Sequence, residues 1–278
     1  MGIRILTDTS SGITNQEAKD LKIDMARMPI IFGDEEFIDG ETIQLDEFYD
    51  RMENRGQMPK TALVNKQIFL EIFEDVKNKN EEMVVFLISQ HLSATHENAV
   101  KALEEINYDK IHIIDTLLTT TPLAALVFEA VKLRDAKKSA KEILENCNEL
   151  KTKVKVYAMV RTLKYLVAGG RLSKASGAIG GMLNLKPIIS ISDGKIANVH
   201  KSIGLKSAFS FISQKFKTAD VDKSKPVYFC NTNNVKESLE FKNSLKDEKF
   251  IDGGIRDIGS TVGSHVGPGV VGIAFFEN

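Results

Sequence analysis

The chain has 278 residues, of which 42% are hydrophobic, and its 37 basic and 38 acidic residues leave a net charge of −1. At the usual size of about 150 residues per domain, this length predicts two domains of an ordinary soluble protein. The balanced charge gives no electrostatic reason to expect binding of nucleic acid.

Cysteine and histidine usage narrows the function classes further. The two cysteines, Cys147 and Cys230, lie far apart and outside any CxxC spacing, so we expect neither a disulfide framework nor a structural zinc site. The histidines show no metal-ligand spacing, and we expect no metal and no cofactor. No signal peptide is visible, and the longest apolar run, residues 116–128, is too short to span a bilayer. We therefore expect a cytoplasmic protein without an integral membrane segment.

The N-terminal half alternates apolar, strand-like runs with amphipathic helices. Thr14, with Glu17 three residues later, is typical of a capping box that opens a helix. Repeated strand–helix–strand order favours a mostly parallel sheet with helices on both faces. The predicted strands cover 3–7, 28–32, 83–89 and 111–114, and the predicted helices cover 46–55, 66–79, a segment from about Thr95, and segments up to about Lys151.

The C-terminal half mixes a hairpin with helical crossovers. Asp193-Gly194 is typical of the turn between two strands of a hairpin. This mixture predicts an α+β domain, so we expect an α/β domain over 1–153, a mixed α+β domain over 154–278, and a ligand between them. The predicted strands cover 155–160, 187–191, 195–199 and 226–230, and the predicted helices cover 203–217 and 235–245.

Polar clusters follow three of the predicted N-terminal strands, at 8–11, 89–93 and 115–116. In open parallel sheets, ligands bind outside the carboxyl ends of the strands. Ser93 also stands just before the helix predicted near Thr95, where unpaired backbone N–H groups favour an anion. From its position alone, Ser93 is more readily interpreted as a helix cap than as a ligand contact.

Two glycine-rich segments carry the strongest signals. The first joins Gly169-Gly170 to Arg171, followed by a small-residue segment, 175–181, that we predict to be helical. Glycine lets backbone approach a ligand closely, and the planar arginine fork matches a carboxylate or phosphate. The second segment places His265 among the glycines of 263–269. Both patterns indicate places where a small anion could be held.

These segments, GGR at 169–171 and HVGPG at 265–269, resemble the signature of the DegV family, bacterial proteins that bind long-chain fatty acids such as palmitate. The resemblance covers the whole chain. It implies a lipid-binding protein that holds the acid in an apolar tunnel. Further family motifs occur in order as Asp8-Thr9-Ser10-Ser11, Pro29 to Phe32 with Gly33-Asp34, Pro59-Lys60-Thr61 and Leu92-Ser93-Ala94-Thr95.

The resemblance also implies roles for four residues. The hydroxyls of Thr61 and Ser93 match those that contact the ligand carboxylate, and Arg171 and His265 match the arginine and histidine near the head group. By local sequence alone, Thr61 reads as a loop or cap residue. Several positions depart from the family pattern and bear on head-group geometry: Ala62-Leu63-Val64 replaces Ser-Gln-Pro, Ala94 replaces glycine, His96 replaces tyrosine, and Pro122 and Ala124 replace glycines.

Three functions remain open at this point. The resemblance implies a carrier that presents its fatty acid to a separate fatty-acid kinase and is not itself an enzyme. An alternative is an enzyme acting on a phosphorylated or acyl substrate, with Asp8 and His265 as acid–base groups. No P-loop, GxSxG pattern or cysteine–histidine pair supports that alternative. A lipid-sensing regulatory protein would share the pocket and differ only in its partner.

Overall fold

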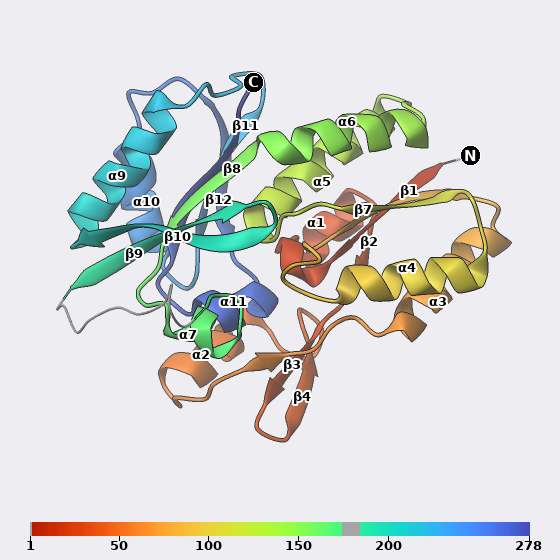
Figure 1. The fold of residues 1–278 in the computed structure, drawn as a ribbon, viewed down its shortest axis with the longest axis horizontal. Helices are drawn as coiled ribbons and strands as arrows, with labels where there is room; N and C mark the ends of the chain where they lie inside the picture. The colour runs from red at the N-terminus through yellow and green to blue at the C-terminus, as the bar shows by residue number, and fades with distance from the viewer. Residues whose placement is uncertain (1, 174–183) are drawn as a thin grey trace.

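The computed structural model describes residues 2–173 and 184–278, and it contains three β-sheets with helices packed against them (Figure 1). Two of the sheets are built from residues before 116, and the third is built from residues after 153. The helix expected over 175–181 lies outside the described residues.

The first sheet is parallel and has helices on both faces, as predicted. Side chains alternate along β6 (Glu82–Leu87), one of the two inner strands of this sheet: Val84 and Phe86 pack against one helical layer, and Val85 and Leu87 pack against the other. The strand order is β2 (Ile23–Ala26), β1 (Ile3–Asp8), β6 (Glu82–Leu87) and β7 (Ile111–Asp115). One face is covered by α3 (Lys66–Asn78) and α4 (Thr95–Ile106), and the other by α1 (Asn15–Asp20), α5 (Thr120–Asp135) and α6 (Ala140–Lys153).

A small antiparallel sheet takes the strand expected over 28–32. The turn at Gly33, with φ of 60°, folds this strand back on its successor instead of leaving it in the parallel sheet. The third strand, only two residues long, was not predicted. The strand order is β4 (Glu35–Ile38), β3 (Pro29–Phe32) and β5 (Lys60–Thr61), and α2 (Leu45–Glu53) packs beside it.

The six-stranded sheet is mixed, as predicted for the C-terminal half. Its first four neighbouring pairs are antiparallel and its last pair is parallel. Helix α9 begins later than expected because the preceding strand continues to Ile203. The strand order is β10 (Lys195–Ile203), β9 (Leu185–Ser192), β8 (Val154–Met159), β13 (Val271–Phe276), β11 (Pro226–Asn231) and β12 (Ile251–Asp257). The helices are α7 (Lys164–Ala168), α9 (Leu205–Thr218), α10 (Val235–Asn243) and α11 (Ser260–Val266), and η1 (Thr9–Ser11) lies near α11.

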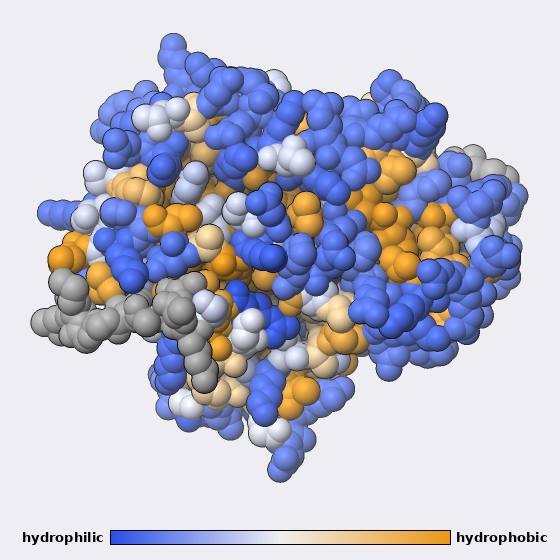
Figure 2. All heavy atoms as spheres, viewed as in Figure 1, coloured by the Kyte–Doolittle hydropathy of each residue, from blue (hydrophilic) through white to orange (hydrophobic). Residues whose placement is uncertain are grey.

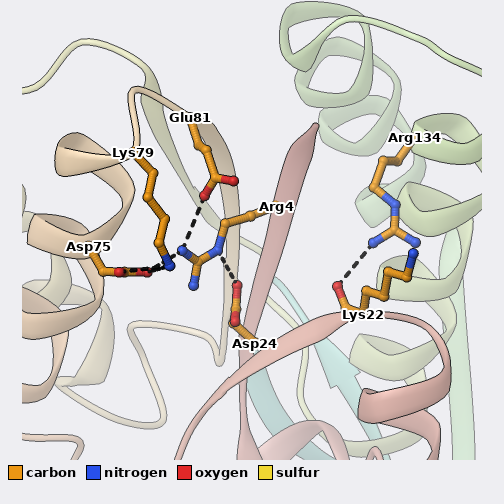
Figure 3. Close-up of polar contacts among 7 residues, drawn as sticks. All are labelled: Arg4, Lys22, Asp24, Asp75, Lys79, Glu81 and Arg134. Carbon is orange, nitrogen blue, oxygen red and sulfur yellow. Dashed lines mark hydrogen bonds and ion pairs between the residues drawn. The ribbon is translucent and has the colours of Figure 1, made fainter. Parts of the chain in front are cut away.

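Ion pairs hold the amino-terminal end of the parallel sheet. Arg4 lies between three carboxylates, at 2.8 Å from Asp24, 2.7 Å from Asp75 and 3.3 Å from Glu81 (Figure 3). This network ties β1 to β2 and to the α3–β6 connection. In parallel sheets of this kind, ligands bind at the opposite, carboxyl-terminal end of the strands.

The surface is mostly hydrophilic, but hydrophobic residues gather toward the middle of the face in Figure 2. None of the helices in the described part of the chain has the length and apolar character needed to cross a bilayer. Both cysteines are free and buried.

Candidate functional site

A cavity of about 410 Å³ brings Thr61, Ser93, Arg171 and His265 together. These four residues, called the clasp below, come from β5, the loop before α4, the segment after α7, and α11. Sequence positions as far apart as 61 and 265 thus meet at one place. The rest of this main cavity is lined by Met28, Ala62, Leu63, Ile88, Leu92, Ala94, Thr119, Ile196, Thr261, Val262 and Val266.

Thr61 and His265 contact each other directly. Pairing of Thr61 with Ile30 in β3 fixes its backbone, and its Oγ1 lies 2.9 Å from Nε2 of His265. Burial, together with the nearby positive charge of Arg171, lowers the pKa of His265 to about 4. His265 is therefore a neutral imidazole at physiological pH.

The surroundings of the ring indicate which nitrogen of His265 carries the hydrogen. Nδ1 is buried and has no hydrogen-bond partner among the described residues. A buried N–H without an acceptor is rarer than a buried acceptor without a donor. We infer that Nε2 holds the hydrogen and donates it to Thr61 Oγ1. The hydroxyl hydrogen of Thr61 is then available to an anion in the cavity.

Ser93 is arranged in a similar way through Thr95. The fully buried Thr95 Oγ1 accepts from the backbone N–H of Val64 at 3.2 Å and lies 2.9 Å from Ser93 Oγ. Ser93 Oγ is the other hydrogen-bonding neighbour of that hydroxyl, so we infer that Thr95 donates to it. Ser93 Oγ also accepts from the backbone N–H of Thr95 at 3.3 Å, at the start of α4. Its own hydroxyl hydrogen is then free to be donated to a ligand.

Arg171 connects the two halves of the chain at the clasp. Its Nε donates to the carbonyl of Leu92, directly before Ser93, at 3.0 Å, and its Nη1 donates to the carbonyl of Gly169. It forms no ion pair with any described residue, and burial lowers its pKa. A half-buried guanidinium without a carboxylate partner is an electrostatic site for an anion.

Glycine is required at positions 169 and 170 for two different structural reasons. A Cβ on Gly169 would lie 2.2 Å from Nδ1 of His265, so the glycine makes room for the imidazole rather than for a ligand. Gly170 has φ of 73° and open space around it, so it is needed only for the left-handed turn. The GGR pattern therefore positions His265 and turns the chain so that Arg171 can reach Leu92.

Because the two glycines have different roles, alanine substitutions at 169 and 170 form a matched pair of variants. Gly169→Ala should displace His265 from Thr61 and weaken binding of an anionic ligand at least tenfold, the effect of losing about 1.4 kcal/mol. Gly170→Ala should cost about 1–2 kcal/mol of stability through backbone strain and leave affinity within about twofold. Calorimetric titration and thermal unfolding of both variants check this. Equal losses of affinity would contradict the role given to Gly169.

Two further cavities adjoin the main one. A deep chamber of about 40 Å³ shares Thr119, Ile196, Val262 and Val266 with it and continues between β8, β9 and β11. An outer cavity of about 520 Å³ shares Thr61, Arg171 and His265 and is also lined by Lys60 and Tyr165. Three of the four clasp residues thus lie between the main cavity and the outer one, and the apolar chamber adjoins the main cavity at other residues. The chamber is lined otherwise by Thr120, Val156, Ala158, Ile189, Ser190, Ile191, Cys230, Ile258 and Val270.

The other polar clusters predicted at the strand ends serve the fold. Asp8 is fully buried, accepts from the N–H groups of Ser10 and Ile88, and has its pKa raised to about 6 by burial. It is not among the residues that line the main cavity. Asp115 accepts from the N–H of Gln90 and of Leu117. This geometry gives no support to Asp8 and His265 acting as a catalytic pair.

Sequence reasoning missed several residues of the site. Thr95, which orients Ser93, carried no local signal beyond its place at a helix start. Thr261 lines the cavity and donates to the buried Asp39, whose pKa is raised by burial. Ile196 reaches the cavity from the hairpin turn that was predicted, but its direction could not be read from the pattern. Of the departures from the family motif, Ala62, Leu63 and Ala94 line the main cavity.

The fold and the clasp together define a protein with a mainly apolar pocket between its sheets, with four polar residues gathered in the pocket lining. The chain belongs to the DegV family, because the family model described as an uncharacterised protein of that family matches residues 2–278. A DegV domain-containing protein of Caldanaerobacter subterraneus subsp. tengcongensis is 29% identical over 277 residues, which are 99% of each chain.

Solved structures share the fold at lower identity. A DegV family protein from Thermus thermophilus, described by its fatty-acid binding, has a TM-score of 0.90 and 21% identity, with all of both chains covered. A stearic-acid-binding protein from Eubacterium ventriosum has a TM-score of 0.87 and 22% identity, covering 100% of this chain and 98% of that one. At these identities the similarity demonstrates the shared fold.

Proposed function

We propose that this protein binds a long-chain fatty acid, with its tail in the main cavity and its carboxylate at the clasp. The observation that carries the proposal is the meeting of Thr61, Ser93, Arg171 and His265 in the lining of a mainly apolar cavity. The fatty acids named for structurally similar proteins support the same ligand class.

The energetics of such a ligand suit this arrangement. Burying an acyl chain is worth ~0.8 kcal/mol per methylene, so the tail provides most of the affinity. A carboxylate carried into the protein without partners costs several kcal/mol. The hydroxyl hydrogens of Thr61 and Ser93, with the charge of Arg171, offset that cost and fix the orientation of the acid. Neutral His265 acts through Thr61.

We further propose that the protein is a carrier without catalytic activity of its own, which presents the acid to a separate fatty-acid kinase in the cytoplasm. The outer cavity supports this, because Thr61, Arg171 and His265 line it as well as the main cavity, so a carboxylate held by them would lie beside this second space. The same geometry suits a lipid sensor, and a pull-down for a kinase or a transcription factor separates the two.

We also propose a domain boundary near 153, which agrees with the division of strands among the sheets.

Native mass spectrometry tests the ligand class and its stoichiometry together. Protein purified from a bacterial host should carry one long-chain fatty acid per chain, released on denaturation, and delipidated protein should be stabilised thermally by palmitate or oleate. Absence of bound lipid together with no thermal stabilisation by either acid would reject the proposal.

A further inference from the structure

The β9–β10 hairpin extends beyond the sheet to which it belongs. Strand β9 pairs with β8 at Ile188 and Ile189, four residues before the turn. At the turn, Asp193 and Gly194 have φ values of 48° and 75°, which is the geometry of a tight two-residue hairpin. Figure 1 shows the hairpin reaching from the six-stranded sheet toward the parallel sheet.

The hairpin tip is attached to the parallel sheet by a buried hydrogen bond. The Oγ of Ser89, just after β6, donates to the carbonyl of Gly194 at 2.8 Å. The approach is close, because a Cβ on Gly194 would lie 2.5 Å from this Oγ and 3.0 Å from the side chain of Leu117. Ser89 is fully buried, and it also accepts from the N–H of His91. This single contact therefore joins segments 105 residues apart.

Two residues after the turn, the hairpin contributes a wall of the pocket. Ile196 packs against two separate hydrophobic clusters, one of the parallel sheet and one around β8 and α11. It also lines both the main cavity and the deep chamber. Ile196 is therefore one of the four residues, with Thr119, Val262 and Val266, that surround the passage from the main cavity into the chamber, and it is the one that the hairpin carries.

We propose that Ile196 is a gate between the main cavity and the deep chamber, held in place by the bond from Ser89 to Gly194. A long acyl chain enters or leaves the chamber when the hairpin tip separates from Ser89 and carries Ile196 away. A shorter chain that fits the main cavity does not need this movement. The inference rests on the proposed fatty-acid function and adds the step that controls exchange of long chains.

The first test removes the hydroxyl. Ser89→Ala should release palmitic acid roughly fivefold faster, the factor that matches the net loss of one hydrogen bond of about 1 kcal/mol. Release of decanoic acid should stay within about twofold of the wild-type rate. Stopped-flow transfer of each acid to an acceptor gives the rates. Ser192→Ala, which alters an exposed hydroxyl of the same hairpin, is the matched control.

A second test closes the gate reversibly. The double variant Ser89→Cys with Gly194→Cys places two thiols close enough to be oxidised to a disulfide, whose formation mass spectrometry verifies. Because a side chain at position 194 crowds Ser89 and Leu117 in itself, the reduced double variant is the reference: oxidation should slow its release of palmitic acid at least tenfold, and reduction should restore the rate, with decanoic acid unaffected. The single variant Ser89→Cys under the same oxidant controls for the buried Cys147 and Cys230.

The outcomes separate the gate from the function on which it rests. If the wild type binds neither acid, the proposed function fails. If it binds palmitic acid, but Ser89→Ala releases both acids at wild-type rates, the gate is wrong and the function stands. Equal slowing of both acids in the oxidised double variant would likewise overturn the gate. If that variant does not fold, the result with Ser89→Ala decides.

Discussion

Arg171→Gln should weaken binding of palmitic acid by a factor of roughly 150 to 5,000. Arg171 is the cation of the clasp and has no carboxylate partner among the described residues, so a bound carboxylate would lose its counter-charge. Removing one partner of a buried ion pair costs about 3–5 kcal/mol, which corresponds to this range. Isothermal titration with delipidated protein measures the change.

The control for this variant uses a ligand without charge. Arg171 also donates to the carbonyls of Leu92 and Gly169, so its loss has a structural component as well. Hexadecanol has the same tail as palmitic acid and no carboxylate, and its affinity should change less than about fivefold. An equal loss for the alcohol and the acid would show that Arg171 supports the fold and does not bind the carboxylate.

The second large effect is a pH dependence of stability that originates at His265. Its pKa is about 4 in the folded protein and 6.5 in the reference state, so the unfolded chain binds the proton more tightly. The contribution of His265 to the free energy of unfolding does not change above pH 6.5, and the folded state loses stability as the pH falls from 6.5 toward 4. A difference of this size corresponds to about 3 kcal/mol.

A comparison with His265→Gln isolates this contribution. Asp8 acts in the opposite direction, because burial raises its pKa to about 6 and its penalty is relieved as the pH falls below that value. The wild-type profile alone therefore mixes two effects. The difference in unfolding free energy between wild type and His265→Gln, measured by denaturant titration without ligand, should shift by up to about 3 kcal/mol between pH 7 and 4 in favour of the variant. Parallel profiles would contradict a buried, neutral His265.

The sequence predicted the helices and three of the four strands of the parallel sheet because these elements carry local patterns, but it missed β2, and the strand expected over 28–32 lies in the small antiparallel sheet. The apolar strand before Ser89 and the capping box at Thr14 are examples. The small antiparallel sheet was not predicted because β5 has two residues and its pairing with β3 is set by tertiary contacts. Thr61 belongs to this strand, so its role could be suggested only by family resemblance.

The contacts within the clasp were beyond the sequence for a similar reason. The bond between Thr61 and His265 joins residues 204 positions apart, and no periodicity reports such a meeting. The glycine at 169 was interpreted as room for a ligand, whereas its absent side chain makes room for an imidazole. Resemblance named which residues to examine, and only the structure showed what each of them contacts.

The most direct test is a crystal structure of the protein with palmitic acid bound. We expect its carboxylate oxygens within hydrogen-bonding distance of Thr61 Oγ1 and Ser93 Oγ, about 2.5–3.0 Å, with the tail extending past Ile196 into the deep chamber. An acid bound with its carboxylate away from these hydroxyls, or bound elsewhere while the cavity stays empty, would contradict the account.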